Sequence, residues 1–183
     1  MQNQLKLLFI LLLISPVLAF SQPSNEVKRL AQYNLWANEQ MLAWLAQAST
    51  TQLDSQLISS FSSLRLTLIH IYGAERGWLS LLQAGEWAGL SDAEGLSFEV
   101  LSQQFREGSQ ALATYAGALK PEALSEKRIF GRSGSKASQA DILLHVLNHS
   151  TYHRGQLISL GRQAGLESPP RTDYIYWIQL LDE

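Results

Sequence analysis

Histidine is the residue type whose spacing in this sequence could do chemistry. Three histidines, His145, His149 and His153, follow one another at intervals of four residues. In an α-helix four residues span about 6 Å and slightly more than one turn, so neighbouring members of this series can present imidazole nitrogens to one metal ion. Metal–nitrogen bonds are about 2.0 to 2.1 Å long, so His145 and His153, two turns apart, cannot easily share that ion. One adjacent pair is therefore expected to bind, and the spacing leaves open which pair.

The fourth histidine, His70, lies near the middle of a second predicted helix. A neighbouring helix of a bundle could supply it as a third ligand from across the core. Three neutral imidazoles leave coordination positions open for water or substrate, as in catalytic zinc and related nickel or iron centres. Such a site offers Lewis acidity and the activation of water or a thiol. The alternative is that the histidines are ordinary hydrogen-bonded helical residues, because H-x-x-x-H pairs also arise by chance.

Several other classes of function are excluded. The residues after His145 and His149 are Val146 and Ser150, so the H-E-x-x-H motif of metalloproteases is missing. The sequence has no G-x-S-x-G nucleophile motif, and the glycines near 131–136 lack the spacing of a phosphate-binding loop. Without cysteine the chain has no disulfide, thiolate ligand or catalytic thiol. A formal net charge of -2 argues against a nucleic-acid partner, which needs a basic surface.

Long amphipathic helices must position these histidines. The spacing of apolar residues predicts them at 25–48, 63–83, 97–119 and 139–164. Ser24 and Ser97 are the expected N-caps of two of these helices. Ser138 and Asp141 form a capping box that begins the helix with three histidines, and Gly165 is expected to end it in the left-handed conformation.

The connections are predicted to be irregular. Glycines and acidic residues between 84 and 96 indicate a loop, and residues 128–135 are expected to form an exposed connection rather than a strand. Two prolines at 169–170 bar a helix, after which 173–181 should form a short helix that packs its aromatic residues on the body. We therefore expect an all-α, single-domain four-helix bundle with a short C-terminal helix.

The first 21 residues are expected to lie outside this domain. After a short basic start, residues 7–20 form an uncharged run that is shorter than the roughly 20 apolar residues of a membrane span. Small residues at Ala19 and Ser21 suit cleavage after either position. We predict a signal peptide over 1–21, a mature domain over 22–183, a periplasmic or secreted location and no stable membrane anchor. An uncleaved anchor is the alternative.

The sequence around the histidines resembles the DinB family. Residues 143–157, L-L-H-V-L-N-H-S-T-Y-H-R-G-Q-L, closely resemble the signature helix of that family. Residues 34–42 resemble its first helix, 68–79 its second, and 169–177 its C-terminal segment. The resemblance covers nearly the whole chain after the leader.

This resemblance implies an up-down-down-up bundle, a homodimer and a divalent metal held by three histidines. Carried over by motif, the ligands are His70, His149 and His153, and His145 falls on a non-ligand position, where we expect it to pack or to orient a ligand. Zinc or nickel is the expected metal, with iron as a further candidate. The sequence indicates no general base, because Glu75 lies off the ligand face and is expected at the surface or in an ion pair.

Some residues near the motifs are expected to be structural. Gly73 and Gly77, four residues apart on one helical face, should let a neighbouring element come close. Trp78 should belong to the bundle core, and Arg154 and Gln156 should tie helices together.

The fold by itself does not choose a reaction, because relatives of the family include thiol-dependent isomerases and transferases as well as hydrolases. Our leading hypothesis is a metal-dependent enzyme, of the hydrolase or thiol-transferase type, that acts on a small-molecule substrate or thiol. The alternative is a non-catalytic bundle that binds a metal ion or a small ligand.

Overall fold

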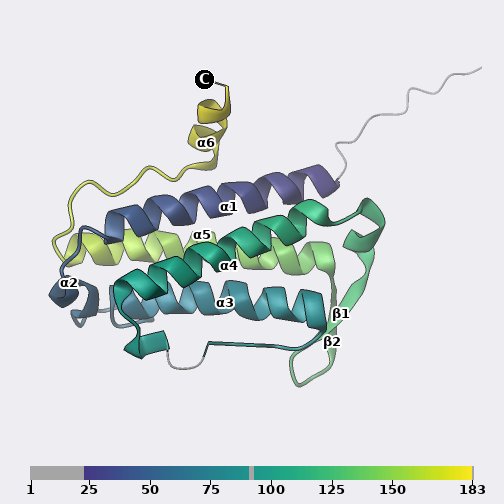
Figure 1. Cartoon of the computed structure of the whole chain (residues 1–183), viewed down its shortest axis with the longest axis horizontal. Helices are drawn as coiled ribbons and strands as arrows, with labels where there is room; N and C mark the ends of the chain where they lie inside the picture. Colours follow the sequence, from purple (N-terminus) through teal and green to yellow (C-terminus); the bar gives the residue numbers. More distant parts are fainter. Residues whose placement is uncertain (1–22, 91–92, 183) are drawn as a thin grey trace, which may run out of the picture.

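The computed structural model describes residues 23–90 and 93–182 and has the expected all-α architecture (Figure 1). Four long helices form the bundle: α1 (Pro23–Leu45), α3 (Leu64–Ala84), α4 (Phe98–Ala118) and α5 (Gln139–Gln163). The predicted leader, residues 1–21, lies outside the described residues and stays a prediction. Within the two described ranges, no helix combines the length and the apolar character that crossing a membrane requires.

The helices follow the expected up-down-down-up order. Helices α1 and α5 run in one direction, and α3 and α4 run in the other (Figure 1). Helix α1 packs against α4 and α5, and α3 packs against the same two helices, so α1 and α3 are diagonal. The connection from α3 to α4 returns along the length of the bundle and includes the short 3-10 helix η1 (Ala93–Gly95). As a result, the two helices that carry the histidines, α3 and α5, are antiparallel neighbours.

Side-chain caps set the ends of the helices that hold the candidate site. The Ser138 hydroxyl accepts a hydrogen bond from the Asp141 amide at 3.1 Å, and the Asp141 carboxylate accepts from the Ser138 amide, which confirms the predicted capping box. Gly165 follows the C-cap with φ 81°, a conformation that favours glycine. Ser97 caps α4 as predicted, by accepting from the backbone of its third helical residue. The start of α5 is thereby fixed, and with it the positions of its histidines.

The connection before α5 contains a β-hairpin, so the prediction of an irregular segment at 128–135 is wrong. Strands β1 (Lys127–Phe130) and β2 (Ser135–Ser138) pair antiparallel. Gly131 and Gly134 turn the chain at φ 66° and 68°. The strands are only four residues long, and their pairing depends on this turn rather than on an alternating apolar pattern, which the sequence lacks.

Two smaller differences concern helix ends and short helices. Helix α1 begins at Pro23, whose fixed φ suits the first helical position, so Ser24 lies inside the first turn and is not the N-cap. The prediction also omits helix α2 (Thr50–Asp54), although Ser49 and Gln52 have the S-x-x-Q spacing of the capping box that begins it, and the 3-10 helix η2 (Pro121–Ser125).

The core consists of aliphatic and aromatic side chains at the helix interfaces. Burial of one such side chain stabilises the fold by about 1.5 to 3 kcal/mol. Those at most 1% exposed include Leu68, Ile71, Phe105, Leu112, Leu143, Val146 and Leu157. All four long helices supply such residues, with Met41 and Leu45 from α1 and Leu101 from α4 among them, so the core fixes α3 and α5 within the bundle.

The C-terminal helix α6 (Tyr174–Leu181) lies outside the bundle, beside α1 (Figure 1). Trp177 is buried and its ring centroid lies 5.9 Å from that of Tyr33 on α1. The Tyr33 hydroxyl donates a hydrogen bond to the Thr172 carbonyl at 2.6 Å. These contacts confirm that the terminal helix packs its aromatic residues on the body.

Candidate metal centre

Three histidines converge between α3 and α5. The Nε2 atom of His70 lies 3.0 Å from Nε2 of His149 and 3.1 Å from Nε2 of His153. The ligand atoms of the three residues all lie within 4.8 Å of one another. Such separations are close to those of nitrogen atoms bound to one ion at about 2.0 to 2.1 Å. We call these three residues the histidine trio, and the trio could bind a divalent metal ion.

Two histidines of the trio have a pKa below the ordinary value for histidine. Burial, together with the charges of His153, His70 and His145, lowers the pKa of His149 to about 4. Burial and the charge of His153 also lower the pKa of His70. Both rings are therefore neutral near pH 7, so that each can offer a lone pair, which is the form that metal ligation requires.

The hydrogen bonding within the trio is incomplete. Three Nε2 atoms that face one another cannot all be satisfied by each other, because a neutral imidazole has only one N–H donor. In the described part of the chain, the buried Nδ1 of His149 also has no hydrogen-bond partner. A cation that accepts the three Nε2 lone pairs would resolve the crowding of these atoms, although it would not supply a partner for Nδ1 of His149.

Gln156 orients one ring of the trio. The Gln156 Oε1 atom lies 2.8 Å from Nδ1 of His153, one turn earlier on α5. Since a carbonyl oxygen only accepts, Nδ1 carries the proton and Nε2 keeps its lone pair for the site. We expected Gln156 to tie helices together, but the contact lies within one helix and acts on a candidate ligand instead.

Aromatic side chains flank the trio. The Phe61 ring stacks on His70 with a centroid distance of 4.0 Å and an interplanar angle of 26°. The Tyr152 ring meets His153 edge-on at 4.9 Å, and this tyrosine is 64% exposed. Apolar rings on two sides lower the local dielectric and leave the trio only partly open to water.

His145 is not part of the trio. Its ring centroid lies 6.0 Å from that of His149 and 5.0 Å from that of Trp78 on α3, which it meets edge-on. The expectation that His145 packs beside the ligands therefore agrees with its position. Trp78 is half-buried and packs against the hydrophobic core, in agreement with its predicted position.

Glu75 is fully buried, so its predicted surface position is wrong. Its side chain is 0% exposed and lies among four helices. One carboxylate oxygen accepts three hydrogen bonds and the other accepts one. The donors are Asn34 Nδ2 at 2.7 Å, Asn38 Nδ2 at 2.9 Å, Ser150 Oγ at 2.8 Å and Ser109 Oγ at 2.7 Å.

Arg154 completes this group and ties α5 to α1, as predicted. It is 2% exposed, and one guanidinium nitrogen donates to Asn34 Oδ1 at 2.6 Å and to Asn38 Oδ1 at 2.7 Å. The two asparagines therefore bridge a buried cation and a buried anion. We call the group the Glu75 network; its members are Asn34, Asn38, Glu75, Ser109, Ser150 and Arg154.

A polar pair in α1 is the sequence signal for this network. Asn34 and Asn38 are four residues apart in a helix whose neighbouring positions Ala37, Met41 and Leu42 are apolar and buried. A polar pair on an apolar helical face indicates buried hydrogen bonds with another element. The partners come from α3, α4 and α5, and local patterns do not identify them.

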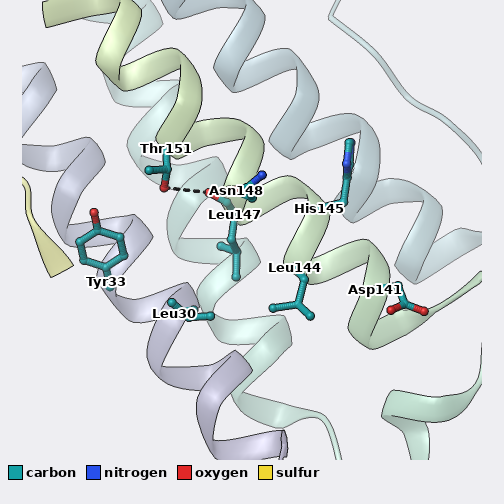
Figure 2. Close-up of a pocket in the computed structure, with 8 residues that line it drawn as sticks. All are labelled: Leu30, Tyr33, Asp141, Leu144, His145, Leu147, Asn148 and Thr151. Atoms are coloured by element: carbon teal, nitrogen blue, oxygen red, sulfur yellow. Dashed lines mark hydrogen bonds between the residues drawn. The ribbon is translucent and has the colours of Figure 1, made fainter.

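A separate cavity of about 510 Å³ lies between α1 and α5 (Figure 2). The trio does not line it, although His145 and Asn148 do, so this cavity is not the candidate metal centre. Its lining residues are Leu30, Tyr33, Asp141, Leu144, His145, Leu147, Asn148 and Thr151.

Comparisons with known proteins find one family model and relatives of similar length. The model of the DinB family matches residues 22–180. Protein DinB of Bacillus subtilis (strain 168) is 29% identical over 158 residues, which cover 80% of this chain and 90% of that protein. The uncharacterized protein YizA of the same organism is 27% identical over 148 residues, covering 79% and 91% of the two chains.

A solved structure has the same fold. The crystal structure of a DinB-like protein from Bacillus cereus ATCC 10987 matches with a TM-score of 0.62 and 23% sequence identity. The match covers 78% of this chain and 94% of the other. At this identity the comparison supports the bundle alone.

Proposed function

The chain belongs to the DinB family, and on this premise we propose that it is a metal-dependent enzyme in which His70, His149 and His153 bind one zinc or nickel ion. The observation that carries the proposal is the convergence of three Nε2 atoms from α3 and α5. A set of three imidazoles leaves coordination positions open, unlike a closed structural site with four protein ligands.

Each residue around the site has a definable task. The trio would hold the ion, which when bound supplies Lewis acidity and lowers the pKa of a coordinated water or thiol. Gln156 keeps the His153 Nε2 atom unprotonated, because it holds the proton on Nδ1. Phe61 and Tyr152 limit the access of water on two sides.

The surroundings of the trio are compatible with either water or a thiol as the reacting group. In the chain as described, no carboxylate joins the trio. Glu75 accepts hydrogen bonds from four side chains and is committed to its own network. A metal ion held by three imidazoles would lower the pKa of a bound water as well as that of a bound thiol, so a carboxylate base is not required for either. We therefore propose a hydrolase or a thiol-dependent transferase.

Cobalt loading tests the proposal. We expect the metal-free protein to take up about one equivalent of Co²⁺ and to give the absorption of a nitrogen-ligated ion, and 2-mercaptoethanol to add a thiolate charge-transfer band. Product formation is then measured with thiols and electrophilic acceptors. The His149→Ala variant should lose spectrum and turnover together, whereas His145→Ala should keep the spectrum, and Gln163→Ala, an exposed glutamine of the same helix, should keep both. Turnover that persists in metal-free His149→Ala would refute the proposal, and metal binding without any product would favour the non-catalytic alternative.

We also propose that the mature protein is periplasmic or secreted and that it forms a homodimer. The uncharged run at 7–20 and the small residues Ala19 and Ser21 at its end support the location. Intact mass of the protein from a native fraction should show a new N-terminus after Ala19 or Ser21, and light scattering should give twice the chain mass. A full-length mass would contradict the cleavage of the leader and the proposed location. A monomer would contradict the proposed homodimer.

A further inference from the structure

Two glycines of α3 seat side chains from the loop that follows this helix. Gly77 lies seven residues after His70, which is two turns or about 10.5 Å along the same face of the helix. A Cβ atom at Gly77 would lie 2.3 Å from the Trp87 ring, so glycine is required for the indole to rest on the helix backbone. At Gly73, between these positions, a Cβ atom would lie 3.4 Å from Leu90. The predicted close approach is therefore confirmed at Gly77, whereas the contact at Gly73 is an ordinary one, and the approaching element is this loop.

The seated Trp87 side chain is nevertheless exposed. It is 54% exposed, and its ring centroid lies 5.3 Å from that of Trp78, which it meets edge-on. Trp87 packs on the helix backbone at Gly77 and against the indole of Trp78. It therefore presents a fixed apolar surface to solvent. Exposed apolar surface at a defined position is typical of a ligand-binding or interaction site.

This surface continues to the candidate metal centre. Besides Trp87, Trp78 contacts Phe130 of the hairpin at a centroid distance of 5.7 Å and His145 of α5 at 5.0 Å. His145 in turn lies 6.0 Å from His149 of the trio. We call His145, Trp78, Trp87 and Phe130 the aromatic platform. It is built from α3, α5, the loop after α3 and the hairpin, and it starts one helical turn from a candidate ligand.

We infer that the aromatic platform binds the flat, apolar part of a small-molecule substrate whose reacting group is held at the histidine trio. The inference rests on the proposed function, because the trio must hold the other end of the molecule. Aromatic rings stack or meet edge-on at centroid distances of 4.5 to 7 Å, which a half-exposed indole can offer to an incoming ring. Since only His145 of the platform is titratable, the surface suits an uncharged ring.

Matched thiols test this inference on the cobalt-loaded protein. The probes are phenylalkanethiols with one to four methylene groups, each paired with the alkanethiol that lacks the phenyl ring. The dissociation constant of each is read from the thiolate charge-transfer band. The phenyl member should bind about fivefold more tightly at the chain lengths that reach the platform. Trp87→Ala should abolish this preference and leave the affinity for alkanethiols and for Co²⁺ unchanged.

Two further variants separate loss of the platform from damage to the fold. Gly77→Ala adds a methyl group where the Trp87 ring lies, so it should displace the indole and remove the phenyl preference although the tryptophan is still present. Trp36→Ala removes a tryptophan of α1 that packs near Tyr33 and Tyr176, and it should keep the preference. Equal affinity for the paired thiols in the wild type, or a preference that survives in Trp87→Ala, would overturn the platform and leave the proposed function intact. If no cobalt spectrum forms at all, both fail.

Discussion

The histidine trio and the Glu75 network share helices α3 and α5 but are built in opposite ways. Along α5 they alternate, because His149 precedes Ser150 and His153 precedes Arg154. In the network, both carboxylate oxygens of Glu75 accept hydrogen bonds, and Glu75 and Arg154 are 0% and 2% exposed. In the trio, ring nitrogens face one another and one buried nitrogen lacks a partner.

This difference separates a structural group from a binding group. A buried polar network is stable only when its members are satisfied, and then it specifies one arrangement of the helices. The Glu75 network takes members from all four long helices and so fixes their relative register. The three Nε2 atoms of the trio cannot satisfy one another, which leaves lone pairs that a cation can accept. The Glu75 network therefore holds together the helices that position the histidine trio.

The largest effect on stability is expected from removing the arginine of the Glu75 network. Arg154→Met removes the cation, leaves two asparagine oxygens without donors and leaves the Glu75 charge uncompensated. Breaking a buried pair in this way costs about 3 to 5 kcal/mol of the free energy of unfolding. Urea unfolding of the metal-free protein measures it, with the exposed Arg106→Met as a matched control that should change stability by about 0.5 kcal/mol or less. A loss below about 1 kcal/mol in Arg154→Met would show that the network is not a closed structural unit.

Binding of a metal ion to the trio should have the next largest effect on stability. Zinc at a hundred times its dissociation constant should raise the free energy of unfolding by about 2.7 kcal/mol, because the folded state alone presents the converged ligands. Thermal unfolding with and without zinc measures the gain. The same addition should leave His149→Ala unchanged, and an equal gain in that variant would mean that zinc binds elsewhere.

A smaller effect is expected from the residue that orients the trio. Gln156→Ala removes the acceptor for His153 Nδ1 and should weaken metal affinity about tenfold while stability without metal is preserved. Competition with a chromophoric chelator measures the affinity. Gln163→Ala, an exposed glutamine of the same helix, is the control and should bind as the wild type does. Wild-type affinity in Gln156→Ala would remove its orienting role.

The smallest effect on stability should come from removing one histidine of the trio in the metal-free protein. His149→Ala removes a ring whose buried Nδ1 has no partner, so the free energy of unfolding of the metal-free protein should change by about 0.5 kcal/mol or less. Urea unfolding beside Arg154→Met gives the contrast directly. A loss of several kcal/mol in the free energy of unfolding would show that the trio, like the Glu75 network, is a structural group.

The two regions also differ in how far the sequence predicts them. The spacing of His145, His149 and His153 in one helix shows that a metal pair is possible, and the family motif selects His70, His149 and His153. The capping box at Ser138 sets the register of that helix, so local patterns carry most of the candidate site.

The Glu75 network could not be predicted in the same way. Its contacts join residues up to 120 positions apart, such as Arg154 and Asn34, and they depend on which helices become neighbours. The spacing of Glu75 from His70 places it off the ligand face, and the sequence alone does not say that this other face is covered by α1 and α4. The β-hairpin was missed for a related reason, because four-residue strands are set by their pairing and turn.

The most direct test of the central claim is the metal content of the untagged protein purified from its native compartment. Mass-spectrometric elemental analysis should find about one equivalent of a single transition metal, zinc or nickel, in the wild type and in His145→Ala. Alanine at His70, His149 or His153 should remove it. A wild-type protein that carries no metal and takes none up at micromolar supply, or a His149→Ala variant that retains its full equivalent, would contradict the assignment of the trio as a metal site.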